Sequence, residues 1–154
     1  MTAVGTLVLD QVSKTIARSV LNFNRAIELI RGFFSLRLTE NPGAAFGALG
    51  SWPPILILVG LAAVLIIVGM RKERSKSRVL AISLGLLLGG TLGNLIDRIR
   101  FGHVTDFLDF TVRMDGRNLS WPTFNLADIA ITFGVALLIY HAFFVEAKLD
   151  RKKA

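Results

Sequence analysis

The sequence predicts an all-α integral membrane protein with four transmembrane helices and a small extracytoplasmic β-rich region between helices one and two. Three charge-free stretches, residues 41–70, 79–96 and 129–145, are the main observation. They approach or exceed the ~20 apolar residues that a helix needs to cross ~30 Å of hydrocarbon. Their apolar residues do not alternate with period two, which argues against a membrane β-barrel. The apolar content of 53% agrees with this class.

Basic residues are concentrated in two short segments that the predicted topology places on one side. Residues 71–78 hold five Lys or Arg, and residues 148–153 hold four. Short loops rich in Lys and Arg remain in the cytoplasm. The net charge of +7 is therefore expected to reflect membrane orientation and not nucleic-acid binding. Both termini are predicted to be cytoplasmic.

The 154 residues are expected to form one membrane domain, with helices at about 1–20, 53–70, 79–97 and 125–145 and extracytoplasmic regions at about 21–51 and 98–122. The first helix is the least apolar, because Asp10, Lys14 and Arg18 recur every four residues and share one face. Such a face suits a spanning helix only where it is turned toward other helices or the interface. A helix lying on the membrane surface is the alternative.

The second predicted helix begins at Pro53 and Pro54, because proline is well tolerated in the first turn of a helix. The region before it contains residues 33–39, whose weak alternation is typical of a strand. A turn is predicted at residues 41–43, Asn-Pro-Gly. The third and fourth helices follow from the remaining charge-free stretches, and the region 98–122 between them is expected to be a loop of mixed charge.

Carboxylates stand at the ends of the third and fourth predicted helices. The pattern Asn-x-x-Asp occurs as Asn94 with Asp97 and again as Asn125 with Asp128, and Asp106 lies between the two. The topology brings all of them to the outer face of the membrane. Two neighbouring carboxyl groups cannot both ionise easily, so a pair can act as acid and base on a water molecule. This chemistry needs no metal and no cofactor.

The residues alone leave two other interpretations open. Asn125 is a good N-cap, and Asp128 would then lie in the favourable field of the helix start. Proton-coupled transporters also carry carboxylates within the membrane, so a small four-helix transporter is the alternative function. For a hydrolase, Asn94 and Asn125 are suited to orient the aspartates. Arg98 is suited to hold the neighbouring Asp97 by a charge-assisted hydrogen bond.

Four sequence blocks, in this order, resemble the lipoprotein signal peptidase family, the type II signal peptidases of bacteria. The blocks are DQVSK (10–14), NPGAAFG (41–47), GGTLGNLIDRIRFGHVTDF (89–107) and FNLAD (124–128). The resemblance implies a four-helix aspartic endopeptidase of the bacterial inner membrane, without a cofactor. Such enzymes cleave the signal peptide from diacylglyceryl-modified prolipoproteins just before the lipidated cysteine.

The resemblance also implies residue roles and partners. Asp106 and Asp128 match the catalytic aspartates of the family, and Asn94, Asp97, Arg98, Asn125, Asp10 and Asn41 match positions that bind the substrate or support the site. The implied site lies at the extracytoplasmic face. The implied partners are lipid-modified prolipoproteins, membrane lipid and inhibitors of the globomycin type, with no nucleic acid and a monomeric enzyme. The family block often reads V-V-D-F, where this chain has Thr105 before the aspartate.

Overall fold

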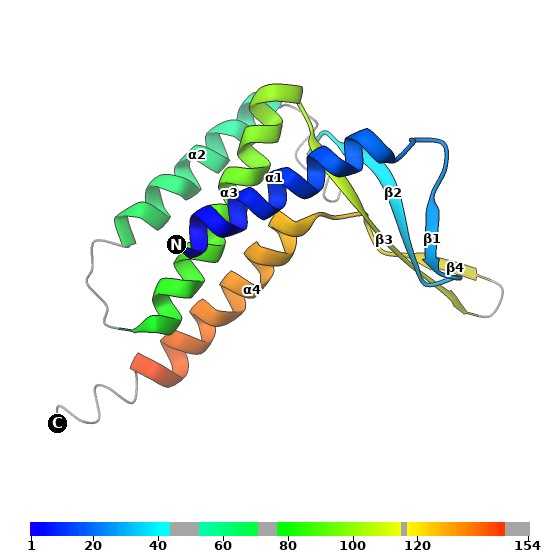
Figure 1. The fold of residues 1–154 in the computed structure, drawn as a ribbon. Helices are drawn as coiled ribbons and strands as arrows, with labels where there is room; N and C mark the ends of the chain where they lie inside the picture. The colour runs from blue at the N-terminus through cyan, green and yellow to red at the C-terminus, as the bar shows by residue number, and fades with distance from the viewer. Residues whose placement is uncertain (44–52, 71–76, 115–116, 147–154) are drawn as a thin grey trace.

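The structure is a computed structural model that describes residues 1–43, 53–70, 77–114 and 117–146. In chain order the elements are α1 (Thr2–Val20), β1 (Ile27–Ile30), β2 (Phe34–Asn41), α2 (Pro53–Met70), α3 (Arg78–Phe101), β3 (Val104–Met114), β4 (Arg117–Ser120), α4 (Leu126–Tyr140) and the π-helical turn η1 (His141–Glu146). Figure 1 shows the helices side by side, with the sheet at one end of them. Most of the predicted basic loop 71–78 and the basic segment 148–153 lie outside the described residues.

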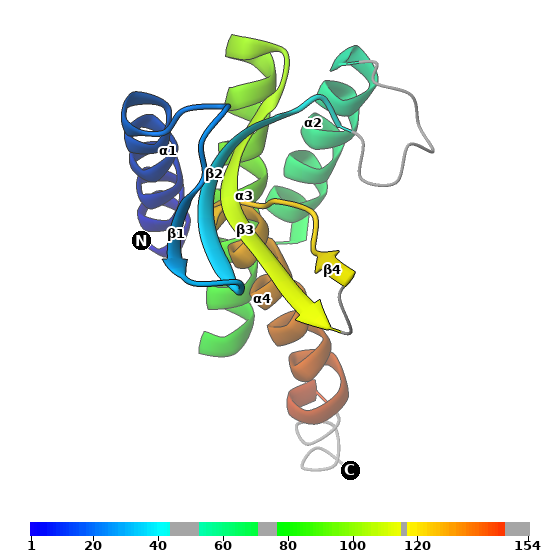
Figure 2. The same cartoon turned by 90° about the vertical axis from the view of Figure 1, so that its right-hand side faces the viewer.

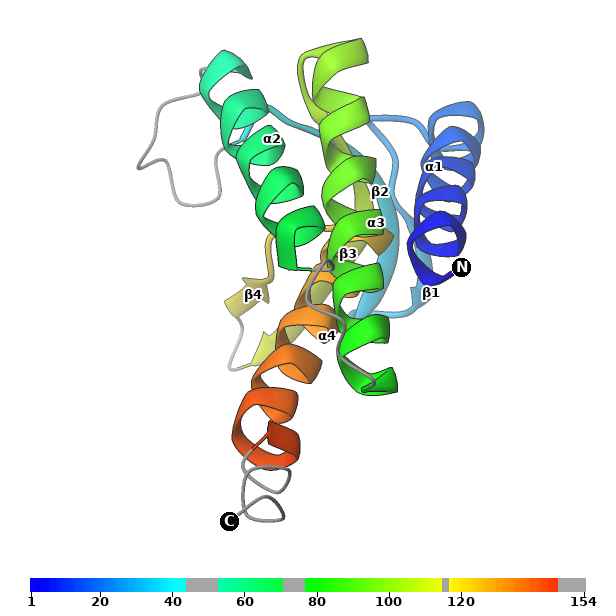
Figure 3. The ribbon, with the colours of Figure 1, turned by 90° about the vertical axis from the view of Figure 1, so that its left-hand side faces the viewer.

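Helix α3 lies at the centre of the helical layer, in contact with α1, α2 and α4 (Figure 3). Leu84, Leu87 and Leu88 of α3 form a buried cluster with Ile67 of α2. The helix begins at the N-cap Ser77, whose side chain accepts a hydrogen bond from the backbone of Leu80. It ends at Gly102, which adopts the left-handed conformation with φ 78°. This central position lets α3 present side chains to every other helix.

Small residues bring α1 and α3 into close contact. Gly85, Gly89 and Gly93 recur every four residues and therefore lie on one face of α3. A Cβ atom added at Gly89 would lie 2.6 Å from the carbonyl oxygen of Ala3, and one added at Gly93 would meet the carboxylate of Asp10. Asp10 and Lys14 are fully buried, so the polar face of α1 is turned toward the other helices, as the four-residue spacing predicts.

We expect Gly93→Ala to lower the stability of the protein by about 1–3 kcal/mol, because the new methyl group would overlap the Asp10 carboxylate. Thermal unfolding of the purified protein in detergent measures the effect. Gly5→Ala in α1 is the matched control, since an added Cβ there has no atom within 4 Å. That substitution is expected to stabilise the helix by about 0.5–1 kcal/mol. Equal melting temperatures for the two variants would contradict the close packing.

The sheet contains four antiparallel strands in the order β1-β2-β3-β4. The prediction of a β-rich region between helices one and two is therefore incomplete, because β3 and β4 come from the segment expected to be a loop (Figure 2). The pairing of β3 is irregular on both sides: Phe107 and Leu108 both donate to the carbonyl of Phe124, and the three steps from Leu36 to Thr39 in β2 match only two steps, from Leu108 to Asp106, in β3. A bulge interrupts the period-two pattern by which a strand is predicted from sequence.

Two helical stretches, Arg78–Phe101 and Leu126–Phe144, are long and apolar enough to cross a membrane, and Pro54–Gly69 is a shorter apolar helix. Large apolar side chains of these helices point outward, as Leu65 of α2 and Phe133 of α4 do with 73% and 62% exposure. Exposed apolar surface of this kind is typical of contact with lipid. The structure thus supports a membrane protein that is mostly helical, with a small antiparallel sheet.

Candidate active site

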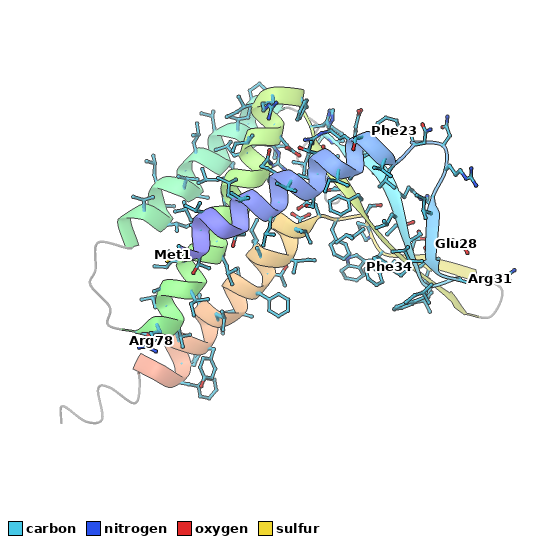
Figure 4. All side chains as sticks on the ribbon, in the orientation of Figure 1. Met1, Phe23, Glu28, Arg31, Phe34 and Arg78 are labelled. Atoms are coloured by element: carbon cyan, nitrogen blue, oxygen red, sulfur yellow. The ribbon has the colours of Figure 1, made fainter. Side chains whose placement is uncertain are left out.

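A layer of buried polar side chains lies where the middle of α1, the last turns of α3, the start of α4 and the start of β3 meet (Figure 4). Its members have at most 7% exposure and include Asp10, Lys14, Asn94, Asp97, Thr105, Asp106 and Asn125. Asp128, Arg98 and Asn41 border the layer and are half-buried. Buried polar groups are costly unless they are hydrogen-bonded. The contacts within the layer therefore show what holds each group in place.

Asn125 contacts both of the predicted catalytic aspartates. Its side-chain Nδ2 donates to Oδ1 of Asp106 at 2.6 Å, and its backbone N–H donates to Oδ2 of Asp128 at 3.2 Å. Its Oδ1 accepts the backbone N–H of Asp128 at 3.0 Å, which completes a capping box at the start of α4. Asn125 is therefore both the N-cap of α4 and a residue of the predicted site. Through its contacts with Asp106 and Asp128 it brings the two carboxyl groups together.

Asp106 lies near the start of β3 and is 1% exposed. Its Oδ2 accepts a hydrogen bond from Nδ2 of Asn41 at 2.8 Å, because Asn41 ends β2 opposite Val104 in the sheet. Burial raises the pKa of Asp106 to about 6, and the negative charge of Asp128 acts in the same direction. The amide hydrogen bonds from Asn41 and Asn125 lower the pKa and limit the rise. A carboxyl group in this range can hold or release a proton near neutral pH.

Asn94 provides a side-chain contact to the other member of the pair, Asp128. Its Nδ2 donates to Oδ1 of Asp128 at 2.8 Å, which places the predicted orienting amide on the predicted catalytic group. Its Oδ1 accepts hydrogen bonds from Lys14 Nζ at 2.8 Å and from Asn125 Nδ2 at 3.2 Å. Asn94 thus joins the carboxyl pair to α1.

Asp97 takes its ionic partners from α1 and not from the neighbouring Arg98. Its carboxylate lies 3.5 Å from Lys14 Nζ and 3.8 Å from Arg18 Nη1, and it accepts the backbone N–H of Thr105 at 3.0 Å. The expected Arg98–Asp97 bond gives way to these contacts because the polar face of α1 packs directly against this part of α3. Asp97 therefore ties α1 and β3 to α3, one step away from the pair.

Arg98 has a different environment from the one predicted. Within the described part of the chain, its Nε is buried without a hydrogen-bond partner. Its positive charge interacts with the carboxylates of Asp128 and Asp106 as well as that of Asp97. Arg98 is therefore a cation beside the carboxyl pair, and its Nε–H donates no hydrogen bond to the described residues.

Asp10 and Lys14 form a buried ion pair with Nζ 2.9 Å from Oδ2. Oδ1 of Asp10 accepts the backbone N–H of Ala127 at 3.0 Å and so binds the first turn of α4 to α1. The role of Lys14 in the site was not predicted from the sequence. Its spacing from Asp10 placed both on one face, but spacing cannot show that the ammonium reaches an amide 80 residues away.

Comparisons with known proteins show which family the chain is similar to. Residues 2–144 match the family described as signal peptidase (SPase) II. A lipoprotein signal peptidase of Moorella thermoacetica is 44% identical over 135 residues, which cover 87% of this chain and 85% of the relative. One from Symbiobacterium thermophilum is 42% identical over 148 residues, with 95% and 94% covered.

Solved structures share the fold as well as the sequence. A structure described as a bacterial membrane enzyme superposes with a TM-score of 0.80 at 30% identity, covering 92% of this chain and 84% of the other. A second structure with the same description gives the same TM-score and identity, with 93% and 90% covered.

Proposed function

The chain belongs to the signal peptidase II family, and on this premise we propose that it is an aspartic endopeptidase that cleaves lipid-modified prolipoproteins just before the lipidated cysteine. The observation that carries the aspartic mechanism is the contact of Asn125 with both Asp106 and Asp128. The raised pKa of Asp106 supports it, because one member of an aspartic pair must keep a proton. A proton-coupled transporter has no support from the relatives.

In the proposed reaction, one carboxyl group of the pair is ionised and the other carries a proton. The carboxylate removes a proton from a water molecule, whose oxygen attacks the carbonyl carbon of the scissile bond while the carboxylic acid protonates the carbonyl oxygen. In the resulting gem-diol, the newly protonated carboxyl group gives its proton to the amide nitrogen. The other takes a proton from a hydroxyl group as the C–N bond breaks. The products are a carboxylic acid and an amine, and the pair returns to its starting state.

The surrounding residues have distinct proposed tasks. Asn41, Asn94 and Asn125 orient the two carboxyl groups through their amides. Asp10 and Asp97 hold α1, α3 and α4 in register around the pair. Arg98 places a positive charge beside it. None of these tasks calls for a cofactor.

Cleavage of a purified prolipoprotein in detergent tests the function directly. A precursor that carries a diacylglyceryl cysteine should be cut once, with the lipidated cysteine at the new N-terminus by mass spectrometry. The same precursor without the lipid should remain uncut, and an inhibitor of the globomycin type should block cleavage of the lipidated form. Proton-driven flux in reconstituted vesicles without cleavage would refute the proposal.

The proposed topology has four spanning helices in the bacterial inner membrane, both termini in the cytoplasm, and a monomeric enzyme with its site at the outer face. The basic residues 71–78 and 148–153 support it, because such segments stay cytoplasmic. The sheet and the polar layer then lie on the outer side. There, a substrate can keep its acyl chains in the membrane while its peptide bond reaches the pair.

The absence of cysteine from the sequence allows a direct measurement of this topology. We expect Arg25→Cys to react with a membrane-impermeant maleimide in intact spheroplasts, because the turn before β1 would lie outside. Ser75→Cys should react only after lysis. Equal labelling of the two variants in intact spheroplasts would contradict the four-span arrangement.

The pH profile of cleavage is expected to respond to Asn41. The Asn41 amide lowers the pKa of Asp106, which burial raises to about 6, so Asn41→Ala should raise that pKa further. With Asp106 as the protonated member of the pair, activity falls as pH rises through its pKa. The alkaline limb of the cleavage rate should therefore move to higher pH, by about one unit or less. Rates recorded between pH 4 and pH 9 test this, and a limb that moves to lower pH would contradict it.

A further inference from the structure

Lys14 is a fully buried lysine that the hydrolysis described above does not use. Its Nζ lies 2.9 Å from the carboxylate of Asp10 and 3.5 Å from that of Asp97. It also donates to Oδ1 of Asn94 at 2.8 Å. The ammonium group has three N–H donors, and the amide oxygen of Asn94 accepts the third contact; what that contact does for Asn94 needs a separate explanation.

The orientation of the Asn94 side chain provides that explanation. Its Oδ1 faces two donors, Lys14 Nζ at 2.8 Å and Asn125 Nδ2 at 3.2 Å, and its Nδ2 faces Oδ1 of Asp128 at 2.8 Å. If the amide turned over, its NH₂ group would face both donors and its oxygen would face a carboxylate. The charged and shorter contact, from Lys14, therefore keeps a hydrogen-bond donor directed at Asp128.

The two carboxyl groups of the pair have different surroundings. Asp128 is the third residue of the α4 capping box, where the backbone N–H groups and the dipole of the helix start favour a negative charge. Asp106 lies in β3, where burial raises its pKa to about 6. A hydrogen bond donated to a carboxylate favours its ionised form, so the Asn94 donor strengthens an asymmetry that the fold already has.

Charged groups approach Asp128 from three elements. Asp106 comes from β3 and Arg98 from α3, while Lys14 of α1 reaches Asp128 through Asn94. The charge of Lys14 is balanced locally, because Asp10, Asp97 and Arg18 complete a group of two cations and two carboxylates (Lys14 to Asp10 2.9 Å, Lys14 to Asp97 3.5 Å, Arg18 to Asp97 3.8 Å). The positive charge of Lys14 also lowers the pKa of Asp106, so Lys14 can favour a proton on Asp106 only through the hydrogen bond that it donates to Asn94.

We propose that Lys14 is a positioning residue that acts through Asn94 to keep Asp128 the ionised member of the pair and the shared proton on Asp106. Asp128 is thereby the group that first takes a proton from water, and Asp106 is the group that first protonates the carbonyl oxygen. The inference rests on the proposed aspartic mechanism and adds to it the order in which the two groups act.

The test removes the lysine without leaving an uncompensated buried charge. Lys14→Met is combined with Asp10→Asn, so the cluster stays neutral and the asparagine oxygen can still accept the Ala127 N–H. We expect kcat to fall about tenfold and the acidic limb of kcat to move up by about one pH unit, with KM little changed. Asn94→Ala should move the limb equally. Adding Asn94→Ala to the double variant should not move it further, because residues acting through one contact are not additive.

Several results would overturn the inference. The first concerns the acidic limb of kcat. If the double variant moves this limb by the same amount with Asn94 present and with Asn94→Ala, the effect of Lys14 does not pass through Asn94. The second is an unchanged limb with only a lower melting temperature, which indicates a structural role alone. Asp109→Asn is the control and should leave the limb in place, because Asp109 pairs with Arg37 and Ser35 and has no described hydrogen bond or ion pair with Lys14, Asn94 or the carboxyl pair.

Lys14→Gln replaces Lys14→Met in the same design if the methionine variant does not fold. If the wild-type enzyme cleaves the lipidated precursor and the acidic limb of the variants matches that of the wild type, only the role of Lys14 is refuted. A wild-type enzyme that does not cleave it would refute this inference and the proposed function together.

Discussion

Replacing either aspartate of the pair by asparagine is expected to abolish cleavage of a lipidated precursor while the protein still folds. Asp106→Asn removes the group that we propose to hold the proton, and Asp128→Asn removes its proposed partner. General acid–base groups contribute about 10²–10⁴-fold to rate, so each substitution should lower kcat by about 10²–10⁴-fold, or about 3–5 kcal/mol of barrier. Quantitative gel analysis of precursor and product at several enzyme concentrations measures the loss.

Asp109→Asn is the matched control for this experiment. Asp109 lies three residues further along β3 and is 4% exposed, but its carboxylate pairs with Arg37 at 3.1 Å and accepts a hydrogen bond from Ser35. It contacts neither member of the pair in any described hydrogen bond or ion pair. We expect this variant to keep cleavage activity within a few fold. An Asp109→Asn variant as inactive as Asp106→Asn would show that the loss comes from damage to the strand.

The second large effect is expected at Asn125, because that residue caps α4 and also orients Asp106. Asn125→Ala removes the N-cap oxygen and the hydrogen bond of 2.6 Å to Asp106. The loss of an N-cap costs about 0.5–2 kcal/mol of stability. The loss of an orienting hydrogen bond should reduce kcat about 10²-fold. Thermal unfolding and cleavage rates, recorded on the same preparation, report the two effects.

Asn125→Ser separates capping from catalysis, because serine is as good an N-cap as asparagine but has no amide to reach Asp106. The serine variant should recover most of the melting temperature and little of the activity. Recovery of both would mean that Asn125 serves only as a cap, which is the structural interpretation that the sequence left open.

Much of the helical layer could be predicted because its physical cause is local. Charge-free stretches of membrane length gave the approximate positions of α2, α3 and α4, and the spacing of Asp10 and Lys14 gave the buried face of α1. The capping box at Asn125 also depends on a short segment of chain. In each case the pattern and the structure that it specifies lie within one element.

Contacts between distant segments account for what the sequence did not reveal. The segment of β3 is predicted to be a loop, and its pairing as a strand depends on residues far from it in sequence, such as Phe124, whose carbonyl accepts from both Phe107 and Leu108. Proximity in sequence predicts Arg98 as the ionic partner of Asp97. This prediction is wrong, because Lys14 approaches Asp97 from another helix. Such pairings depend on the packing of α1 against α3, which no single segment encodes.

The sheet has a consequence for how this enzyme matures. Strand β2 follows the first helix, but its partner β3 is made only after the third, and the hydrogen bond from Asn41 to Asp106 joins residues 65 positions apart. In the proposed topology, a chain inserted helix by helix carries β1 and β2 across the membrane before β3 can pair with β2. We therefore expect cleavage activity only after the segment between α3 and α4 has been translocated, because Asp106 of the proposed pair lies in that segment.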